Sequence, residues 1–164
     1  MIFGNLKKIF FLIPLITSSP DYDITNNIVS SYIARKVHEL DEVNLLGNSG
    51  RDWFEAYFKA GESRSYNFPT EGAVDTIKAF IKVVGRSDLA GAFEIYNNET
   101  LLGLISYKGI NTKSGSTYDL KGDIQNEIFT FLVNDATTIL TLKLPLVAGY
   151  DVLIGYLDQI VLTY

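Results

Sequence analysis

The sequence predicts an all-β fold, an antiparallel β-sandwich of the jelly-roll or galactose-binding-like type. Three observations point to it: a high aromatic content with ten Tyr and ten Phe, runs in which apolar and polar residues alternate, and polar turns that separate these runs at regular spacing. The chain is 47% hydrophobic over 164 residues, enough for the buried core of one domain. No helix-sized segment separates the β-rich runs, which argues against alternating strands and helices.

The strand signals begin near Arg64. Over residues 77–84 every second residue is apolar, as in a strand with one buried face. Further β-rich runs follow, the first four flanking two short polar turns: 92–96 and 101–107, 127–133 and 138–144, then 151–156 and 157–164 with Gly155 as a candidate bulge or bend. The phenylalanines in these patterns are expected in the core: Phe68, Phe80, Phe93, Phe129 and Phe131.

The N-terminus has the parts of a secretory signal. Lys7 and Lys8 precede the apolar run 9–16, and small residues follow at 17–19. An apolar run of this length is far shorter than the roughly 20 residues that cross a bilayer. We therefore expect an exported protein, located in the periplasm, at the cell surface or outside the cell. A buried first strand is the alternative.

Three segments are expected along the chain: a signal peptide at 1–19, an N-terminal segment at 20–62 that packs on the sandwich, and the β-sandwich domain at 63–164. The N-terminal segment is either helical or extended. Val29, Ile33, Val37 and Leu40 are spaced like one face of a helix. The same stretch is also compatible with a strand, so the spacing does not decide whether residues 25–45 are helical or extended.

Charge and composition exclude several classes of function. The chain carries 14 Lys and Arg against 19 Asp and Glu, a net charge of −5 without a basic cluster, so nucleic acid is not an expected partner. There is no cysteine, which excludes a cysteine nucleophile, a disulfide and a thiolate zinc site. His38 is the single histidine and no nucleophile-elbow motif accompanies it. We expect no enzymatic activity.

Two groups of residues are candidates for binding. Tyr107, Tyr118, Tyr150 and Tyr156 lie at strand ends or near glycine-containing loops, where exposed rings stack on sugars or contact proteins. Tyrosines half-buried at the rim are the alternative. Oxygen ligands for a structural calcium ion are available from Asp119, Asp123 and Asp158, although no EF-hand spacing is present and solvated loop charge is the simpler interpretation. No other cofactor is expected.

One stretch resembles a known family. His38-Glu39 leads to Asn44-Leu45, then to Ser49-Gly50-Arg51 and the aromatic pair Trp53-Phe54. This order resembles the region ahead of the catalytic domain in gingipain-like cysteine peptidases, in particular the sortase of the type IX secretion system of Bacteroidetes. Glu55-Ala56 stands where that family has Gly-Glu. A shorter stretch, 156–163, is similar to the closing strand of jelly-roll carbohydrate-binding modules.

Both resemblances imply a β-sandwich in an exported protein. The peptidase family cleaves with a Cys-His pair in a separate domain, and this chain has no cysteine, so the activity is not carried over. Arg51, Trp53 and Phe54 are expected to anchor the N-terminal segment, with both aromatic rings buried.

The expected function is therefore that of a non-catalytic, exported binding or scaffold domain, resembling the accessory β domain of such a sortase. Its partner is a protein or a glycan at the cell envelope. The alternatives are a carbohydrate-binding module and a structural subunit of a surface or viral assembly. An exposed aromatic platform would favour sugar, whereas a broad apolar face or an open sheet edge would favour a protein partner. The sequence does not indicate an oligomeric state.

Overall fold

Antiparallel strands account for the regular structure of residues 32–44, 53–113, 120–147 and 153–164, which the computed structural model describes. The larger sheet has the order β1 (Arg35–Glu39), β11 (Ile154–Thr163), β6 (Thr76–Gly85) and β9 (Asp123–Leu132), with β4 (Phe58–Lys59) beside the start of β11. The smaller sheet has the order β5 (Ser63–Pro69), β10 (Thr137–Lys143), β7 (Gly91–Asn97) and β8 (Thr100–Tyr107). A short pair, β2 (Val43–Asn44) and β3 (Trp53–Phe54), completes the set.

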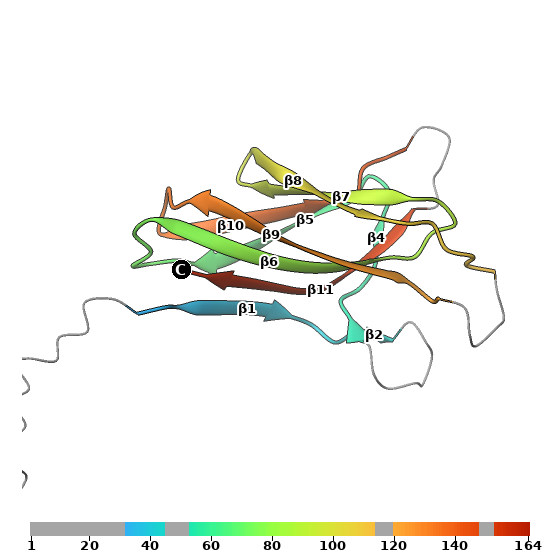
Figure 1. The fold of residues 1–164 in the computed structure, drawn as a ribbon, viewed down its shortest axis with the longest axis horizontal. Helices are drawn as coiled ribbons and strands as arrows, with labels where there is room; N and C mark the ends of the chain where they lie inside the picture. Colours follow the sequence, from blue (N-terminus) through green and yellow to red (C-terminus); the bar gives the residue numbers. More distant parts are fainter. Residues whose placement is uncertain (1–31, 45–52, 114–119, 148–152) are drawn as a thin grey trace, which may run out of the picture. The chain divides into compact units, whose positions relative to one another are not determined.

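The two main sheets form a sandwich around one apolar core (Figure 1). Strand β6 shows why: its alternate residues Ile77, Ala79, Ile81 and Val83 are fully buried, while the residues between them face outward. The smaller sheet meets them with its own fully buried residues, Phe93, Ile95, Leu140 and Leu142. Each large apolar side chain buried in this way stabilises the fold by about 1.5–3 kcal/mol. The predicted antiparallel β-sandwich is confirmed.

The core aromatics follow the same alternation. Phe68 and Phe93 are buried, and Phe129 and Phe131 pack against the core from β9. Phe80 differs from the prediction, because it is an even-numbered residue of β6 and shares the outward face with Lys78 and Lys82.

The connections between strands differ from the expected pattern in two places. Runs 92–96 and 101–107 form the β7–β8 hairpin, in which Asn98 takes a left-handed φ of 52°. Runs 127–133 and 138–144 do not pair, because β9 pairs with β6 and β10 pairs with β5 and β7. The polar turn between them crosses from one sheet to the other.

The last two expected runs are one strand, β11. Its irregularity lies between Leu157 and Gln159, where the register with β6 shifts, and not at Gly155. Gly155 is needed for a different reason: a Cβ there would overlap the ring of Phe93. The bulge places Asp158 at the outer face, where its carboxylate lies 2.6 Å from Lys82 Nζ.

The N-terminal segment is extended where it is described. Residues 35–39 form β1, which pairs with β11 from Arg35 opposite Thr163 to Glu39 opposite Gln159. A helical interpretation of this stretch is wrong, because its apolar residues do not share a buried face: Ile33, Val37 and Leu40 are all exposed. Pairing with an existing sheet edge satisfies the backbone groups of β1 without a helix. Within the described residues no helix is long and apolar enough to span a membrane.

Candidate functional site

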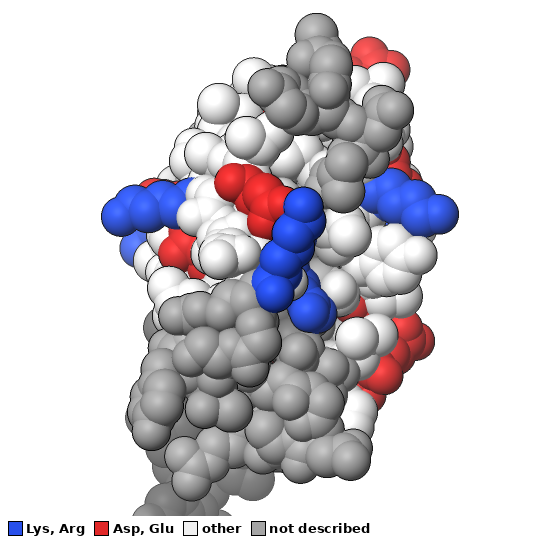
Figure 2. Space-filling model, turned by 90° about the vertical axis from the view of Figure 1, so that its right-hand side faces the viewer, with Lys and Arg blue, Asp and Glu red and all other residues white. Residues whose placement is uncertain are grey.

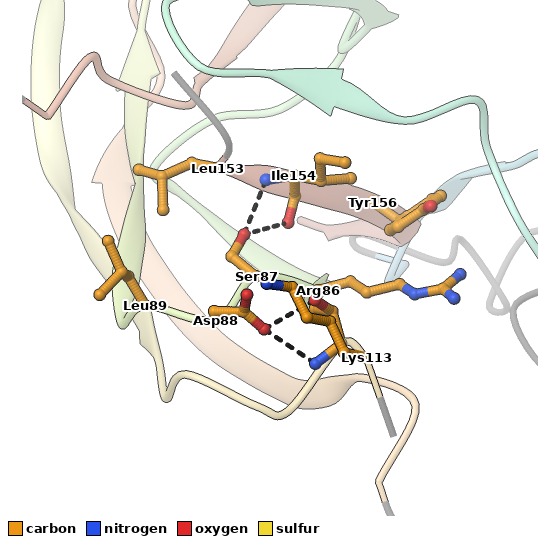
Figure 3. Close-up of a pocket in the computed structure, with 9 residues that line it drawn as sticks. Arg86, Ser87, Asp88, Leu89, Lys113, Leu153, Ile154 and Tyr156 are labelled. Atoms are coloured by element: carbon orange, nitrogen blue, oxygen red, sulfur yellow. Dashed lines mark hydrogen bonds between the residues drawn. The ribbon is translucent and has the colours of Figure 1, made fainter. Parts of the chain in front are cut away.

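A pocket of about 610 Å³ lies at one end of the sandwich, a size typical of ligand sites. It is formed where the loop after β6, the loop after β8 and the start of β11 meet (Figure 3). The described residues that line it are Arg86, Ser87, Asp88, Leu89, Thr112, Lys113, Leu153, Ile154 and Tyr156. In the view of Figure 3, Leu89 and Leu153 lie at one end and Tyr156 and the Arg86 guanidinium at the other.

Ser87 fixes the first loop against β11. Its hydroxyl accepts a hydrogen bond from Ile154 N at 2.7 Å and donates one to Ile154 O at 3.2 Å. Its carbonyl oxygen accepts from Ile110 N at 2.8 Å, which ties in the second loop. A 2%-exposed serine that makes these bonds holds three chain segments together at the base of the pocket.

Asp88 joins the two loops at the pocket mouth. Its Oδ1 accepts hydrogen bonds from Thr112 Oγ1 at 2.6 Å and from Thr112 N at 2.9 Å. These two bonds lower the pKa of the Asp88 carboxyl, the hydroxyl contributing most, so the group is ionised at neutral pH. The carboxylate therefore serves to shape the pocket, and its charge is already compensated by donors.

The rest of the pocket combines an aliphatic floor with basic side chains. Leu153 is 2% exposed and Leu89 is 37% exposed, so the floor runs from the core to the surface. Arg86 and Lys113 form no ion pair shorter than 4 Å with a described acid, and Lys113 lies close enough to Asp88 to help lower its pKa. Figure 2 looks onto this end of the sandwich and shows Lys and Arg side chains close to Asp and Glu side chains, among uncharged residues.

The tyrosines that the sequence suggested do not form an exposed platform where they are described. Tyr107 is 3% exposed and Tyr156 is 6% exposed. The ring of Tyr107 crosses Gly85 and Gly91, where any Cβ would overlap it. Burial raises the pKa of Tyr107. Neither of these two rings is at the surface, and for different reasons: Tyr107 packs into the core, whereas Tyr156 lies on the outer face of the larger sheet and is covered by Phe54. Tyr118 and Tyr150 lie outside the described residues.

The two aromatic residues of the expected anchor lie in different environments. Phe54 is 2% exposed and packs with Val84 and Tyr156 on the outer face of the larger sheet. Trp53 is 43% exposed, so its predicted burial is wrong. Neighbouring residues of a strand point to opposite faces, and therefore β3 can bury only one of the two. Arg51 lies outside the described residues.

The candidate calcium ligands are separated. Asp123 Oδ2 accepts hydrogen bonds from Lys108 N at 2.7 Å and Gln125 Nε2 at 3.0 Å, at the start of β9. Asp158 pairs with Lys82 on β6. Among the described residues no three acidic, histidine or cysteine side chains are grouped as metal ligands, and Asp119 lies outside them. A calcium ion at these acids stays a prediction.

A buried charge cluster was missed by sequence reasoning, and Glu55 is its centre. Its carboxylate lies 2.9 Å from His38 Nε2 and 3.3 Å from Arg64 Nη1, and it accepts the Tyr66 hydroxyl at 3.2 Å. Burial and the Glu55 charge raise the pKa of Tyr66. The one signal was that Glu55 departs from the family pattern; its role depends on β1 and β5 lying side by side, which no local pattern shows.

Arg64 completes this cluster. It donates to the carbonyl oxygens of Ala56 at 2.6 Å and Tyr57 at 2.8 Å, and its guanidinium lies 4.3 Å from the centre of the Phe58 ring. It also contacts Glu62 at 2.9 Å, and the pKa of Glu62 is lowered, first by the Lys59 amide and then by Arg64. The cluster therefore ties β1, the β3–β4 segment and β5 together.

No family model matches this sequence, and no curated protein matches it. Solved structures do match. Dimeric latent PorU from Porphyromonas gingivalis aligns with 80% of this chain at 18% identity and a TM-score of 0.63. The fold is similar to part of PorU. Because the match covers 12% of the PorU chain, the activity of PorU as a whole is not shown for this chain.

Two further structures are similar. The insecticidal delta-endotoxin Cry8Ea1 of Bacillus thuringiensis aligns over 82% of this chain and 24% of its own, at 13% identity and a TM-score of 0.52. The CBM36-1 domain of a xylanase from the hindgut metagenome of Trinervitermes trinervoides aligns over 79% of this chain and 96% of its own, at 9% identity and a TM-score of 0.48. The resemblance to gingipain-like sortases is supported through PorU. At these identities the likeness shows the fold alone.

Proposed function

We propose that this chain is an exported, non-catalytic domain that binds a partner protein in the pocket at the end of the sandwich. The observation that carries the proposal is the combination of an aliphatic floor, from Leu89 to Leu153, with the basic side chains of Arg86 and Lys113. Such a pocket accepts an apolar side chain that has a carboxylate beside it. Arginine binds carboxylates through two parallel hydrogen bonds, which adds geometric selectivity to the charge attraction.

The lining favours a protein segment over a glycan. Sugar rings bind to exposed aromatic faces, but the one described aromatic residue of the lining, Tyr156, is 6% exposed. An aliphatic floor gains more from a Leu, Ile or Phe side chain than from a hydroxylated ring. Glycan binding is therefore an outcome of the test below and not the proposed function.

The proposal that this chain has no catalytic activity is supported by the hydrogen bonds of two side chains that could otherwise act in catalysis. His38, the single histidine, is engaged by Glu55. The nearby Ser65 hydroxyl is 2.8 Å from Thr141 Oγ1. The hydrogen bonds of these two side chains thus join each to a structural partner, which supports binding without catalysis.

The proposal of export is based on the signal-like sequence of residues 1–19, which are not described in the structure. The division of the rest of the chain into an N-terminal segment, 20–62, and a sandwich domain, 63–164, is proposed together with it. Mass spectrometry of the mature protein from its native host checks this proposal. Loss of the first 17–20 residues is the expected result, and an intact Met1 would contradict it.

The binding proposal is tested with a displayed library of random peptides and a glycan array. We expect enriched peptides to carry an apolar residue next to Asp, Glu or a free C-terminal carboxylate, and the array to be silent. Arg86→Glu should weaken the selected peptide at least about tenfold, because a hydrogen bond to a charged group contributes about 1.5–3 kcal/mol. Lys78→Glu makes the same charge change on the exposed outer face of β6 and serves as the control.

Either of two results would contradict the proposal. Selected peptides whose binding is unchanged by Arg86→Glu would place the site elsewhere. A glycan signal that Arg86→Glu abolishes, without any peptide enrichment, would assign the pocket to sugar.

A further inference from the structure

Strand β9 is an open edge of the larger sheet, at a surface distinct from the pocket. It runs for ten residues and pairs with β6 over its whole length without a register shift. Among the described residues no backbone hydrogen bond joins it to any strand but β6. A regular, unpaired edge of this length offers a row of N–H and C=O groups to a further strand.

Strand β9 carries two charged residues, Asp123 at its start and Glu127 near its middle, and both lie on its inner face. Residues 123–132 contain no Lys, Arg or Pro, the residues with which edges are commonly blocked. The side chains on its outer face alternate between aliphatic and neutral polar: Ile124, Asn126, Ile128, Thr130 and Leu132. The three aliphatic ones are 45%, 62% and 67% exposed, in chain order. This is apolar surface beside unpaired backbone.

Ile128 ends an apolar row that crosses the outer face of the whole sheet. It is opposite Phe80 on β6, which is opposite Val161 on β11, which is opposite Val37 on β1. A strand added at β9 would extend this row beyond Ile128. The occupant that continues it with the same chemistry is a second copy of β9.

Self-pairing has one register that matches side chains and charges. If two β9 strands pair antiparallel about a two-fold axis at Ile128, Ile128 faces itself, Ile124 faces Leu132, and Asn126 faces Thr130. Apolar residues then meet apolar ones and polar residues meet polar ones. On the other face, Glu127 is opposite Phe129, so no two acids face each other.

The neighbouring registers are worse. A shift of the axis to Glu127 places two carboxylates directly opposite, which is destabilising. A shift to Phe129 sets Ile128 against Thr130 and Leu132 against Asn126. An axis between two residues would pair outer-face with inner-face side chains, because side chains alternate along the strand.

We propose that the protein forms a two-fold dimer in which β9 of one copy pairs antiparallel with β9 of a second copy, centred on Ile128. Such an interface is self-complementary, as two-fold dimers require. It joins the two larger sheets into one continuous sheet and satisfies the outward backbone groups of both edges.

Because the chain contains no cysteine, single-cysteine variants of the whole chain test the register directly. A disulfide requires Cα atoms about 4.4–6.8 Å apart, a distance met by directly opposite residues. Under mild copper–phenanthroline oxidation we expect Ile128→Cys alone to give a cross-linked dimer. Ile124→Cys alone and Leu132→Cys alone should not cross-link, whereas a mixture of the two should. Val37→Cys, on the same face of the distant edge strand β1, is the control.

Sedimentation velocity provides the readout without cysteines. The unmodified chain should sediment as a dimer, Ile128→Lys as a folded monomer with an unchanged circular dichroism spectrum, and Val37→Lys as a dimer. A monomeric unmodified chain, or Ile128→Cys that cross-links no faster than Val37→Cys, would overturn the proposal. Self-cross-linking of Ile124→Cys would also overturn it, by showing another register. Peptide binding in the pocket is measured separately and does not depend on any of these results.

Discussion

The two sides of the sandwich are closed in different ways. On the side of β1 and β5, here the covered side, a buried charge cluster around Glu55 links the sheets and the β2–β3 pair covers part of the outer face. On the side of β8 and β9, here the open side, the sheets come together through apolar contact. Gly103 of β8 lies so near Phe129 of β9 that a Cβ would be 2.9 Å from the ring.

The difference shows that one fold can treat equivalent edges in opposite ways. The covered edges carry Arg35, Lys36, Arg64 and Pro69, which discourage the addition of a strand. The open edges carry Leu101, Leu104, Ile128 and Leu132, all about half exposed or more. Both sides enclose the same hydrophobic core, so packing of the core does not explain why one pair of edges carries charged residues and the other exposed aliphatic ones. We infer that the covered side is built for stability and the open side for contact.

The largest expected effect lies under the β2–β3 cover. Phe54→Ala should lower the free energy of unfolding by about 3–5 kcal/mol, since it leaves a cavity over Val84 and Tyr156. Trp53→Ala, the matched change next to it, should cost about 1 kcal/mol because that ring is 43% exposed. Urea unfolding measures both. Equal losses would mean that the cover is not anchored by Phe54 alone.

The second largest loss of stability is expected in the charge cluster around Glu55. Arg64→Met removes the guanidinium from a Glu55 carboxylate whose side chain is 11% exposed, and should destabilise the protein by about 3 kcal/mol. His38 and Tyr66 remain as partners, which keeps the loss at the lower end for a broken buried pair. Arg35→Met on exposed β1 should change stability by less than about 0.5 kcal/mol. If the two variants melted at the same temperature, the cluster would contribute nothing to the covered side.

Alkaline pH should weaken the covered side selectively. The pKa of Tyr66 is raised above its usual value of 10.0 in the folded state, first by burial and then by Glu55. Below pH 10 the phenol is protonated in both states, so this contribution to stability is fully present. As pH rises above 10 the unfolded chain ionises first, and stability falls by up to about 1.4 kcal/mol per pH unit for each such group.

Tyr66→Phe should therefore reduce the alkaline slope in urea unfolding between pH 8 and 11. The residual slope is assigned to three other groups with raised pKa values: Tyr107 through burial, and Tyr96 and Lys143 through their hydrogen bonds to Glu94. Tyr57→Phe, which changes an exposed ring, is the control and should leave the slope unchanged. An unchanged slope in Tyr66→Phe would contradict the raised pKa of Tyr66.

The smallest effect is expected on the open side. In dilute, monomeric protein, Ile128→Ser should change the free energy of unfolding by no more than about 0.5 kcal/mol, because the side chain is 62% exposed. Ile81→Val, a smaller change in the buried core one strand away, should cost about 1 kcal/mol. A larger loss for Ile128→Ser than for Ile81→Val would show that Ile128 stabilises the monomer and is not available for contact.

Local sequence patterns predicted several of the strands and, for β6, most of the residues on its buried face. Alternation over 77–84 predicted the residues of β6 that point inward, and the polar residues after 97 predicted the β7–β8 hairpin. These features depend on neighbouring residues, so local patterns are sufficient to predict them.

Strand pairing and the contacts between charged side chains depend on residues that are distant in the sequence, so they are visible in the folded protein alone. The turn after β9 looks like that of a hairpin, yet β9 and β10 belong to different sheets, because the partner that buries each strand is distant in sequence. Likewise, β1 becomes a strand by adding to the edge of β11, although its apolar spacing also suits a helix. Glu55 is 17 residues from His38 and 9 residues from Arg64 in the sequence. The His38 and Arg64 side chains both contact Glu55 because the two sheets lie face to face. Burial of a charge is a property of that three-dimensional packing, and no local pattern of residues encodes it.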